Sequence, residues 1–256
     1  MIFDTHAHYD DEQFDVDREN LLREIFSAGI GNIVNVGASM VTSRQSIALA
    51  KAYPEIYAAV GVHPSDIDCL NEEAYKELRE MAAQEKVVAI GEIGLDYYWD
   101  KEPEVQAAQR EAFKRQLALA REVKLPIIVH SRDAAKDTMD ILAAEEPVEN
   151  PGIIHCYSYS VEQAREYVKM GYYIGVGGVV TFKNAKALKQ VVEEIPLERI
   201  VIETDCPYLT PEPNRGKRNA SLYLPYVVEK IAEIKGLTDA EVEDITFANA
   251  KKVYGL

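Results

Sequence analysis

Five short apolar runs along the chain each end in a histidine or a carboxylate, and this repetition constrains the fold more than any other feature. The runs occupy residues 2–6, 87–92, 126–130, 152–155 and 200–205. Functional side chains at the carboxyl ends of successive strands are typical of a (β/α)8 barrel, whose active sites lie at that end. We therefore expect an α/β protein built as a single TIM barrel, with its active site at the carboxyl ends of the strands.

Strand-like and helix-like segments alternate eight times. The expected strands cover residues 2–6, 32–36, 57–62, 87–92, 126–130, 152–155, 172–176 and 199–204. Apolar residues with helical spacing lie between them, for example in 21–26, 113–120 and 227–234. The capping-box spacing of Ser160 with Gln163, and of Thr238 with Glu241, predicts two helix starts. The alternation favours a parallel sheet. The alternative, a doubly wound open sheet, is disfavoured because no Gly-x-Gly-x-x-Gly follows the first strand.

Length and composition are compatible with one domain over residues 1–256, since 256 residues with 47% hydrophobic content suit one barrel. No linker-like stretch divides the chain, and no tandem repeat is visible. The chain has no leader-like start and no apolar run long enough to span a membrane, so we expect a cytoplasmic protein without membrane contact. Three cysteines without a Cys-x-x-Cys spacing also suit a reducing compartment.

The polar strand ends could bind metal. His6 and His8 alternate with Ala7 in an extended segment, so their side chains point to the same side. The expected ligands are His6, His8, Glu92, His130, His155 and Asp205. Their number suggests two divalent ions, one on His6, His8 and Asp205 and the other on His130 and His155, with Glu92 as a bridge. Nitrogen and carboxylate ligands without thiolates suit Mg²⁺, Mn²⁺ or Zn²⁺ and do not choose between them.

Such a pair of ions predicts hydrolysis. Two ions close together can share a hydroxide and hold the attacking and leaving oxygens of a displacement at phosphorus. We expect catalytic roles for Glu92, as the bridge, and for Asp205, which could accept the proton of the attacking water. His63 exceeds what two ions need and could hydrogen-bond a ligand or a substrate oxygen. Asp4 and Glu203 lie close to ligands in the sequence and could support them.

Cationic and aromatic residues near these strand ends suggest an anionic substrate. Arg132 follows His130 closely, and Arg215 and Lys217 lie in a basic run after the eighth strand, where barrels often bind phosphate. Tyr97, Tyr98 and Trp99 could offer aromatic faces on which an unpaired base stacks. The net charge of −15 argues against a broad nucleic-acid surface, so a polyanion would have to be held locally. Bound cations would reverse the sign of the field in the pocket.

Taken in order, these motifs resemble the TatD family of metal-dependent deoxyribonucleases, a branch of the amidohydrolase-like barrels. The resemblance covers essentially the whole chain. It rests on residues 4–8, Gly61-Val62-His63-Pro64, residues 91–98, residues 130–134, residues 155–158, residues 203–209 and Asn249-Ala250. It implies a TIM-barrel hydrolase with the same six metal ligands, and magnesium-dependent trimming of DNA from the 3′ end. One departure is visible, because Ala220-Ser221 stands where the family typically has an acidic residue and proline.

Three functions remain open from the sequence. The first is a deoxyribonuclease that acts on single-stranded DNA or frayed 3′ ends, with no obligate protein partner. The second uses the same site to hydrolyse a carboxyl ester, lactone or amide, including an aminoacyl-tRNA, since an activated hydroxide can attack carbon as well as phosphorus. Glu92 favours phosphorus, because related barrels with carbon substrates commonly have a modified lysine there. The third, a non-catalytic scaffold, is disfavoured because no expected ligand is missing.

Overall fold

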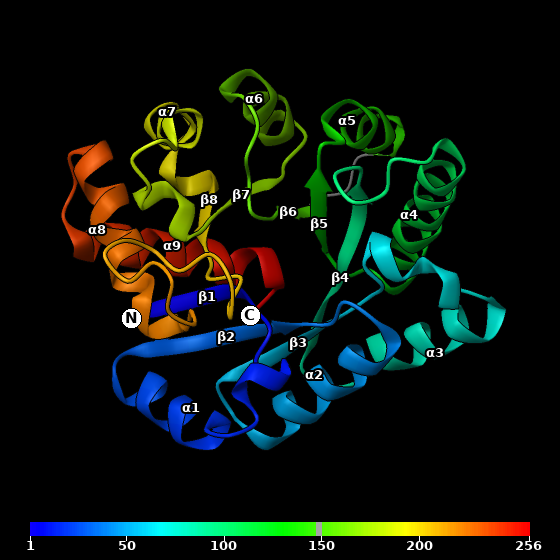
Figure 1. Cartoon of the computed structure of the whole chain (residues 1–256), viewed down its shortest axis with the longest axis horizontal. Coiled ribbons are helices and arrows are strands. Elements are labelled where there is room, and N and C mark those ends of the chain that lie inside the picture. The colour runs from blue at the N-terminus through cyan, green and yellow to red at the C-terminus, as the bar shows by residue number, and fades with distance from the viewer. Residues whose placement is uncertain (147–149) are drawn as a thin grey trace.

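The computed structural model describes residues 1–146 and 150–256. Its eight strands form one parallel sheet in the order β1 to β8 (Figure 1). They are β1 (Ile2–Ala7), β2 (Ile30–Val36), β3 (Ile56–Val60), β4 (Val87–Asp96), β5 (Ile127–Arg132), β6 (Gly152–Ile154), β7 (Tyr173–Val176) and β8 (Ile200–Ile202). The α-helices are α1 (Arg18–Ser27), α2 (Met40–Ala52), α3 (Glu72–Ala82), α4 (Pro103–Val123), α5 (Ala135–Ala144), α6 (Val161–Lys169), α7 (Lys186–Glu194), α8 (Leu224–Lys235) and α9 (Asp239–Tyr254). The expected (β/α)8 TIM barrel is confirmed.

Short 3₁₀ helices lie in the connections. They are η1 (Glu12–Phe14), η2 (Pro64–Cys69), η3 (Gly178–Thr181), η4 (Leu197–Arg199) and η5 (Ser221–Tyr223). Four of them, η1, η2, η3 and η5, follow strands β1, β3, β7 and β8 and belong to the loops at the carboxyl ends of the strands. These loops are the part of a barrel that carries functional groups.

The barrel closes between β8 and β1, next to the expected metal ligands. Ala7 forms a parallel bridge with Cys206. The Asp205 N–H donates to the His6 carbonyl over 2.9 Å, and the His8 N–H donates to the Cys206 carbonyl over 3.0 Å. Because these backbone hydrogen bonds join residues almost 200 positions apart, closure of the barrel itself brings the two ends of the ligand set together.

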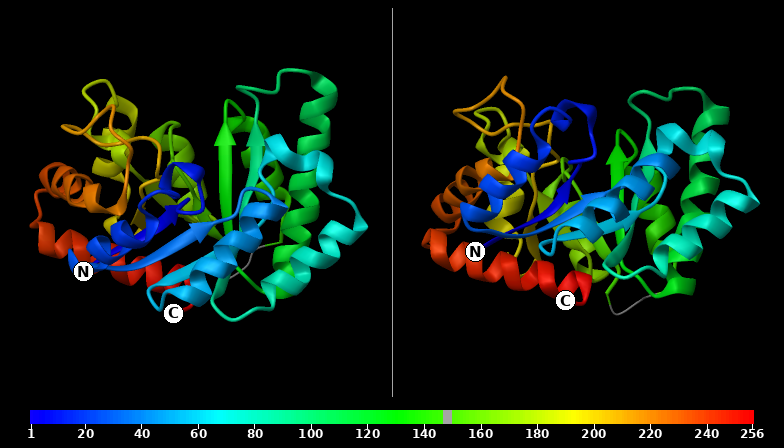
Figure 2. Two further views of the ribbon diagram at one scale, coloured as in Figure 1. Left: turned by 60° about the horizontal axis from the view of Figure 1, so that its bottom comes forward. Right: turned by 90° about the horizontal axis from the view of Figure 1, so that it is seen from below.

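Two hydrophobic clusters hold the barrel together. The inner cluster takes residues from every strand, including Phe3, Ile128 and Tyr173, and is covered by Val253 and Tyr254 of α9. In Figure 2, α9 (red) runs along one end of the barrel, and the loop after β8 (orange) lies at the other. The outer cluster packs the strands against α1 to α8. The expected helical stripes in α1, α4 and α8 are part of it.

The two expected capping boxes differ in outcome. The box of Thr238 and Glu241 is confirmed at the start of α9. At α6, Ser160 accepts the N–H of Gln163, but the Gln163 amide donates to the Ala135 carbonyl, so the reciprocal bond is missing. The predicted helix start is confirmed all the same, because Ser160 is the N-cap of α6.

The boundaries of the two central strands also differ from the expectation. The sequence predicted that β4 ends at Glu92 and β5 at His130, whereas β4 continues to Asp96 and β5 to Arg132. The two strands stay paired past a register shift between Ile90 and Ile93. This continued pairing requires glycine at position 94. The φ of +146° is strained for residues with a Cβ, and a Cβ there would lie 1.9 Å from the His130 carbonyl oxygen. In the part of the chain that the structure describes, no helix is long and apolar enough to cross a membrane.

Candidate active site

The six expected metal ligands come together at the carboxyl ends of the strands. His6 lies in β1, Glu92 in β4 and His130 in β5. His8, His155 and Asp205 lie in the loops directly after β1, β6 and β8. Asp205 and Cys156 both have positive φ, of 55° and 45°. Aspartate tolerates this left-handed conformation better than most residues, which allows the chain to turn at the site itself.

His6, His8 and Asp205 form the first group of candidate ligands. The Nε2 atoms of the two histidines are 3.0 Å apart, and Asp205 Oδ1 lies 3.7 Å from the first and 3.4 Å from the second. The other nitrogen of His8, Nδ1, donates to the Val36 carbonyl over 2.8 Å. With its proton on Nδ1, the neutral ring presents the Nε2 lone pair to the cavity, as a metal ligand must.

Glu92 lies between this group and the second group of candidate ligands, which consists of His130 and His155. Its Oε2 is 3.5 Å from His6 Nε2 and 3.8 Å from His8 Nε2. Its Oε1 is 2.7 Å from His130 Nδ1 and 3.1 Å from His155 Nε2. The carboxylate therefore faces one pair of histidines with each oxygen, which is the arrangement that a bridging ligand requires.

Buried charges in the site balance one another. Burial alone would raise the pKa of Glu92, but the neighbouring His155, His130 and His6 hold it well below its usual range. Burial lowers the pKa of His8, yet the contact with Asp205 outweighs burial and raises it to about 9. Burial likewise opposes protonation of His155, but Glu92 and Glu203 raise its pKa well above the ordinary value. The carboxylates of the site are thus matched by positive charge on the imidazoles.

The donor set fits divalent cations. Three buried side-chain atoms have no hydrogen-bond partner among the described residues. They are His6 Nδ1, His155 Nδ1 and Glu203 Oε2. Ring nitrogens 3.0 Å apart at His6 and His8 need a proton or a cation between them. A proton shared by the two rings would supply that charge, and cations held by the same nitrogens and carboxylates would supply it equally well. Imidazole and carboxylate ligands without thiolate suit Mg²⁺, Mn²⁺ and Zn²⁺ alike.

Asp96 supports the second group and was missed in the sequence. Its Oδ2 lies 3.1 Å from His130 Nε2. When Nε2 donates to this carboxylate, Nδ1 is the nitrogen left to bind a cation beside Glu92. Asp96 is four residues after Glu92 in a strand, and even spacing places side chains on the same face. That spacing was a usable signal, but only once β4 was known to continue past Glu92.

Glu203 and Asp4 accept hydrogen bonds from residues next to the candidate ligands, a supporting position that the sequence suggested. Glu203 Oε1 lies 3.3 Å from His155 Nδ1 and accepts the N–H of Cys156. Gly175 makes room for it, since a Cβ there would lie 2.5 Å from Glu203 Oε2. Asp4 is fully buried, which raises its pKa to about 7. It accepts hydrogen bonds from the hydroxyls of Thr204 and Ser221.

Ser221, in the loop after β8, is hydrogen-bonded to residues of the first strand and its loop. Its hydroxyl lies 2.6 Å from Asp4 Oδ2 and 2.8 Å from the hydroxyl of Tyr9. Its backbone N–H donates to the same Tyr9 oxygen. The loop after β8 is therefore attached to β1 through a buried hydrogen-bond network, directly behind the first group of ligands.

His63 lies at the edge of the second group. It follows β3, and its Nε2 is 4.0 Å from Glu92 Oε1. Its Nδ1 accepts the N–H of Ser65, so the neutral ring carries its proton on Nε2 and presents a donor to the cavity. Burial lowers its pKa to about 4, which keeps the ring neutral near pH 7. This geometry suits a hydrogen bond to a substrate oxygen.

The expected substrate contacts are placed differently from one another. Arg132 and Arg215 are exposed, with guanidinium groups 4.0 Å from the ring centres of Tyr98 and Phe182. Lys217 is exposed and donates to the side chain of Asn214 over 2.9 Å. Arg218, in the same basic run, instead forms a two-pronged ion pair with Asp17. The run therefore offers two of its three cations to a ligand.

Tyr97 does not have an open face at the mouth. Its hydroxyl donates to Asp137 over 2.8 Å and accepts from Arg110 over 2.9 Å. Its ring is half-buried against the core. The exposed aromatic rings of this loop are instead those of Tyr98 and Trp99. Of the three aromatic residues expected to offer a stacking face, Tyr97 is therefore the one whose ring is not exposed.

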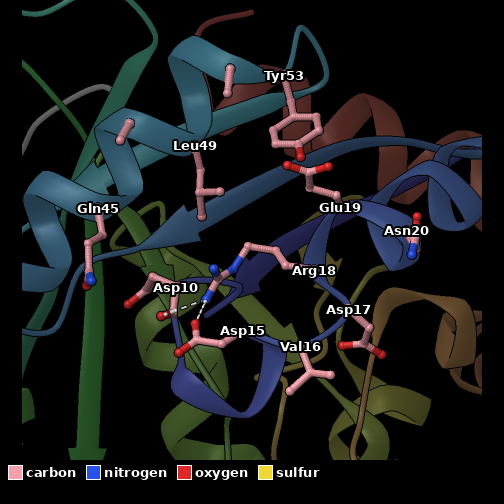
Figure 3. A pocket seen from close by; sticks show the side chains of 12 residues that line it. Asp10, Asp15, Val16, Asp17, Arg18, Glu19, Asn20, Gln45, Leu49 and Tyr53 are labelled. Carbon is pink, nitrogen blue, oxygen red and sulfur yellow. Dashed lines mark hydrogen bonds and ion pairs between the residues drawn. The ribbon is translucent and has the colours of Figure 1, made fainter.

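A separate hollow of about 560 Å³ lies between the start of α1 and α2 (Figure 3). Carboxylates line it, and Arg18 reaches into it and pairs with Asp15. Arg18 also donates to the carbonyls of Tyr9, Asp10 and Asp11. This arginine therefore stabilises the conformation of the loop after β1. Among the described residues, the groups able to hold a metal lie in the barrel mouth and not here.

A TIM barrel whose mouth gathers four histidines and two carboxylates defines a metal-dependent hydrolase. The family model described as "TatD related DNase" matches residues 3–255. The chain therefore belongs to the TatD family, and the resemblance seen in the sequence is confirmed.

Three relatives illustrate the similarity. The chain is 49% identical over 254 residues to "Uncharacterized metal-dependent hydrolase YabD" of Bacillus subtilis, covering 99% of both proteins. It is 33% identical to "3'-5' ssDNA/RNA exonuclease TatD" of Cronobacter sakazakii, covering 99% of this chain and 97% of the relative. The solved structure of YJJV, a TatD homologue from Escherichia coli, superimposes with a TM-score of 0.93 at 30% identity, covering 100% of this chain and 98% of that one.

Proposed function

We propose that this protein is a deoxyribonuclease that trims single-stranded or frayed DNA from the 3′ end with two divalent ions. The observation that carries the proposal is Glu92, whose two oxygens each face a separate pair of histidines. A bridged pair of ions suits a displacement at phosphorus, because it can hold both the attacking and the leaving oxygen. The relative from Cronobacter sakazakii is named a 3′-5′ ssDNA/RNA exonuclease, which supports the same class of substrate.

The cations of the mouth support an anionic substrate. Of the twelve arginines, nine form ion pairs with carboxylates in the described structure, and Arg132, Arg199 and Arg215 do not. Arg132 and Arg215 belong to the carboxyl end of the barrel, where the candidate ligands lie. In a chain with 43 acidic residues, arginines without a carboxylate partner are available to bind phosphate.

The residues of the site would have the following roles in this reaction. Divalent ions bound by the six ligands would activate water and stabilise charge on the phosphate. Asp205 has a side chain 20% exposed, against 0% for His6 and 5% for Glu92, so it is open to substrate. Burial would raise its pKa, but His8 and His155 hold it below the usual value, so the group is a carboxylate that can accept the proton of the attacking water. His63 would donate a hydrogen bond from Nε2 to a phosphate oxygen.

The test is cleavage of a 5′-labelled single-stranded DNA oligonucleotide. Metal-stripped protein is assayed with Mg²⁺, Mn²⁺ or Zn²⁺ restored, beside a His155→Ala control. We expect a ladder that shortens from the 3′ end and is absent in the control. Protein that binds two ions yet cleaves no oligonucleotide with any metal would contradict the proposal and would favour a carboxyl ester or amide as the substrate.

A further inference from the structure

Two neighbouring aromatic side chains beside the candidate active site are open to solvent. Trp99 is 67% exposed and Tyr98 is 42% exposed. Trp99 is also the single tryptophan of the chain. Both follow β4, the strand that carries Glu92. Large aromatic rings gain free energy by leaving water, so such rings at the rim of a site suit a ligand with a flat apolar face.

A cation completes this surface. The guanidinium carbon of Arg132 lies 4.0 Å from the ring centre of Tyr98 and 5.6 Å from that of Trp99. The two aromatic rings are 4.7 Å apart and nearly perpendicular, at 86°. Among the residues that the structure describes, Arg132 has no carboxylate partner, so its charge remains available to a ligand. Stacking surface and positive charge are the two features that proteins combine to bind single-stranded nucleic acid.

The surface is held at a fixed position relative to the candidate metal ligands. Asp96 Oδ1 accepts the backbone N–H groups of Tyr98 and Trp99 over 3.0 and 3.2 Å. The other oxygen of the same carboxylate lies 3.1 Å from His130 Nε2. The position of Arg132 is fixed by the same strands, because Arg132 pairs in register with Asp96 where β4 and β5 end. One carboxylate thus connects the aromatic surface to a metal ligand.

We propose that Tyr98, Trp99 and Arg132 form a subsite that stacks a nucleobase at the 3′ end of the strand being trimmed. The inference rests on the proposed function and adds where the base is held. Stacking needs only a π face and not a particular hydrogen-bond pattern, so the subsite accepts any of the four bases. The Arg132 guanidinium would contact the adjacent phosphate, whose negative charge complements the unpaired cation.

The single tryptophan makes this subsite directly observable. Trp99 fluorescence is titrated with an eight-residue oligothymidylate whose terminal linkages are phosphorothioates, which resist cleavage and keep the negative charge, and with the same oligomer lacking the 3′ base. A 5′ dye reports binding by anisotropy in both cases. We expect the complete oligomer to quench Trp99, and the abasic oligomer to quench it little and to bind about tenfold more weakly, as for the loss of one stacked base.

Variants separate stacking from other effects. In Trp99→Ala the two oligomers should bind alike, whereas Trp99→Phe should restore most of the preference for the complete oligomer. Tyr226→Ala is the matched control, since Tyr226 is an exposed aromatic residue on α8 and should leave the preference unchanged. With a cleavable oligomer, Trp99→Ala should raise KM and leave kcat nearly unchanged.

The outcomes distinguish the subsite from the proposed function. Normal 3′ trimming, together with equal binding of both oligomers by the wild-type protein, would overturn the subsite and leave the nuclease in place. Absence of both binding and cleavage would overturn the two together. If an oligomer binds and leaves Trp99 fluorescence unchanged, the subsite is again excluded. The exposed rings would then contact a different ligand, such as a protein partner.

Discussion

At the scale of single residues, the candidate site depends on which nitrogen of each histidine faces the cavity. A neighbouring acceptor makes the choice in two cases. The Val36 carbonyl accepts a hydrogen bond from Nδ1 of His8, and Asp96 faces Nε2 of His130. The nitrogen left available to a metal is therefore Nε2 in the first ring and Nδ1 in the second. Such outer hydrogen bonds fix the tautomer and orientation of a ligand and increase its affinity for metal.

We predict that Asp96→Asn weakens metal binding about 10- to 100-fold. The amide can still hold the backbone N–H groups of the aromatic loop, but it is a weaker acceptor for His130 Nε2. The measurement is metal affinity by calorimetry on stripped protein. Asp100→Asn is the control, because Asp100 lies on the same loop and accepts from Gln109 instead. Equal affinities for the two variants would show that Asp96 does not position His130.

At the scale of elements, the site is built where β4 and β5 run on together past the expected ends of both strands. Their pairing continues from Ile93 with Val129 to Asp96 with Arg132. The extension adds Asp96 and Arg132 beyond the expected strand ends Glu92 and His130, and so it places candidate metal ligands next to a candidate substrate contact. Its geometry depends on Gly94, the residue of β4 opposite His130.

We predict that Gly94→Ala lowers the free energy of unfolding by roughly 3 kcal/mol or more and also weakens metal binding. The φ of +146° is strained for alanine, and the new methyl group would collide with the His130 carbonyl oxygen. Gly236→Ala is the matched variant, because Gly236 also has positive φ but nothing within 4 Å of its Cβ position. That change should cost about 1 kcal/mol. Urea denaturation measures both, and equal losses would contradict the argument.

At the scale of the whole molecule, charge is distributed unevenly around the barrel. The chain carries a net charge of −15, yet two of its unpaired arginines lie at the mouth. The candidate ligands come from β1, β4, β5 and the loops after β1, β6 and β8. Bound cations would therefore act on two properties of the molecule together, its stability and the electrostatic field that a polyanion meets.

We predict that removing metal lowers the melting temperature by about 5–10 °C for each ion that is lost. One ion at about 100 times its dissociation constant stabilises the folded state by about 2.7 kcal/mol, and each kcal/mol shifts the melting of a domain this size by about 2–4 °C. Thermal unfolding with and without chelator measures the difference. His155→Ala, which lacks one ligand, should show a smaller shift. The same melting temperature in both conditions would argue against bound ions.

We predict that the double variant Arg215→Ala, Lys217→Ala binds single-stranded DNA more weakly and with less dependence on salt. Removing one cation that binds a phosphate should reduce the slope of log affinity against log salt by about 0.7. The control is Lys251→Ala, Lys252→Ala, which removes the same charge from the end of α9, at the opposite end of the barrel (Figure 2). An equal effect of both double variants would mean that only net charge matters.

The sequence was sufficient for the barrel and for naming six candidate ligands that the fold brings together, because both depend on local patterns. Strand-helix alternation reflects burial with a short period, and every expected strand overlaps an observed one. The ligands could be named because each falls at the end of such a run. Asp96 could not, because its role depends on how far β4 remains paired with β5. Trp99 and Tyr98 could not be separated from Tyr97, because the orientation of three successive side chains depends on their neighbours in space.

What the sequence determined, then, is the order of strands and helices and the chemical character of their carboxyl ends. The tertiary structure alone decided which groups meet. It places Glu92 between two pairs of histidines, pairs Arg218 with Asp17, leaves Arg132 without a carboxylate partner among the described residues, and hydrogen-bonds Ser221 to Asp4 across 217 positions. The physical reason is range. Periodic burial is encoded within a few residues, whereas a hydrogen bond or an ion pair is selected only when a closed barrel brings distant side chains within about 3 Å of each other.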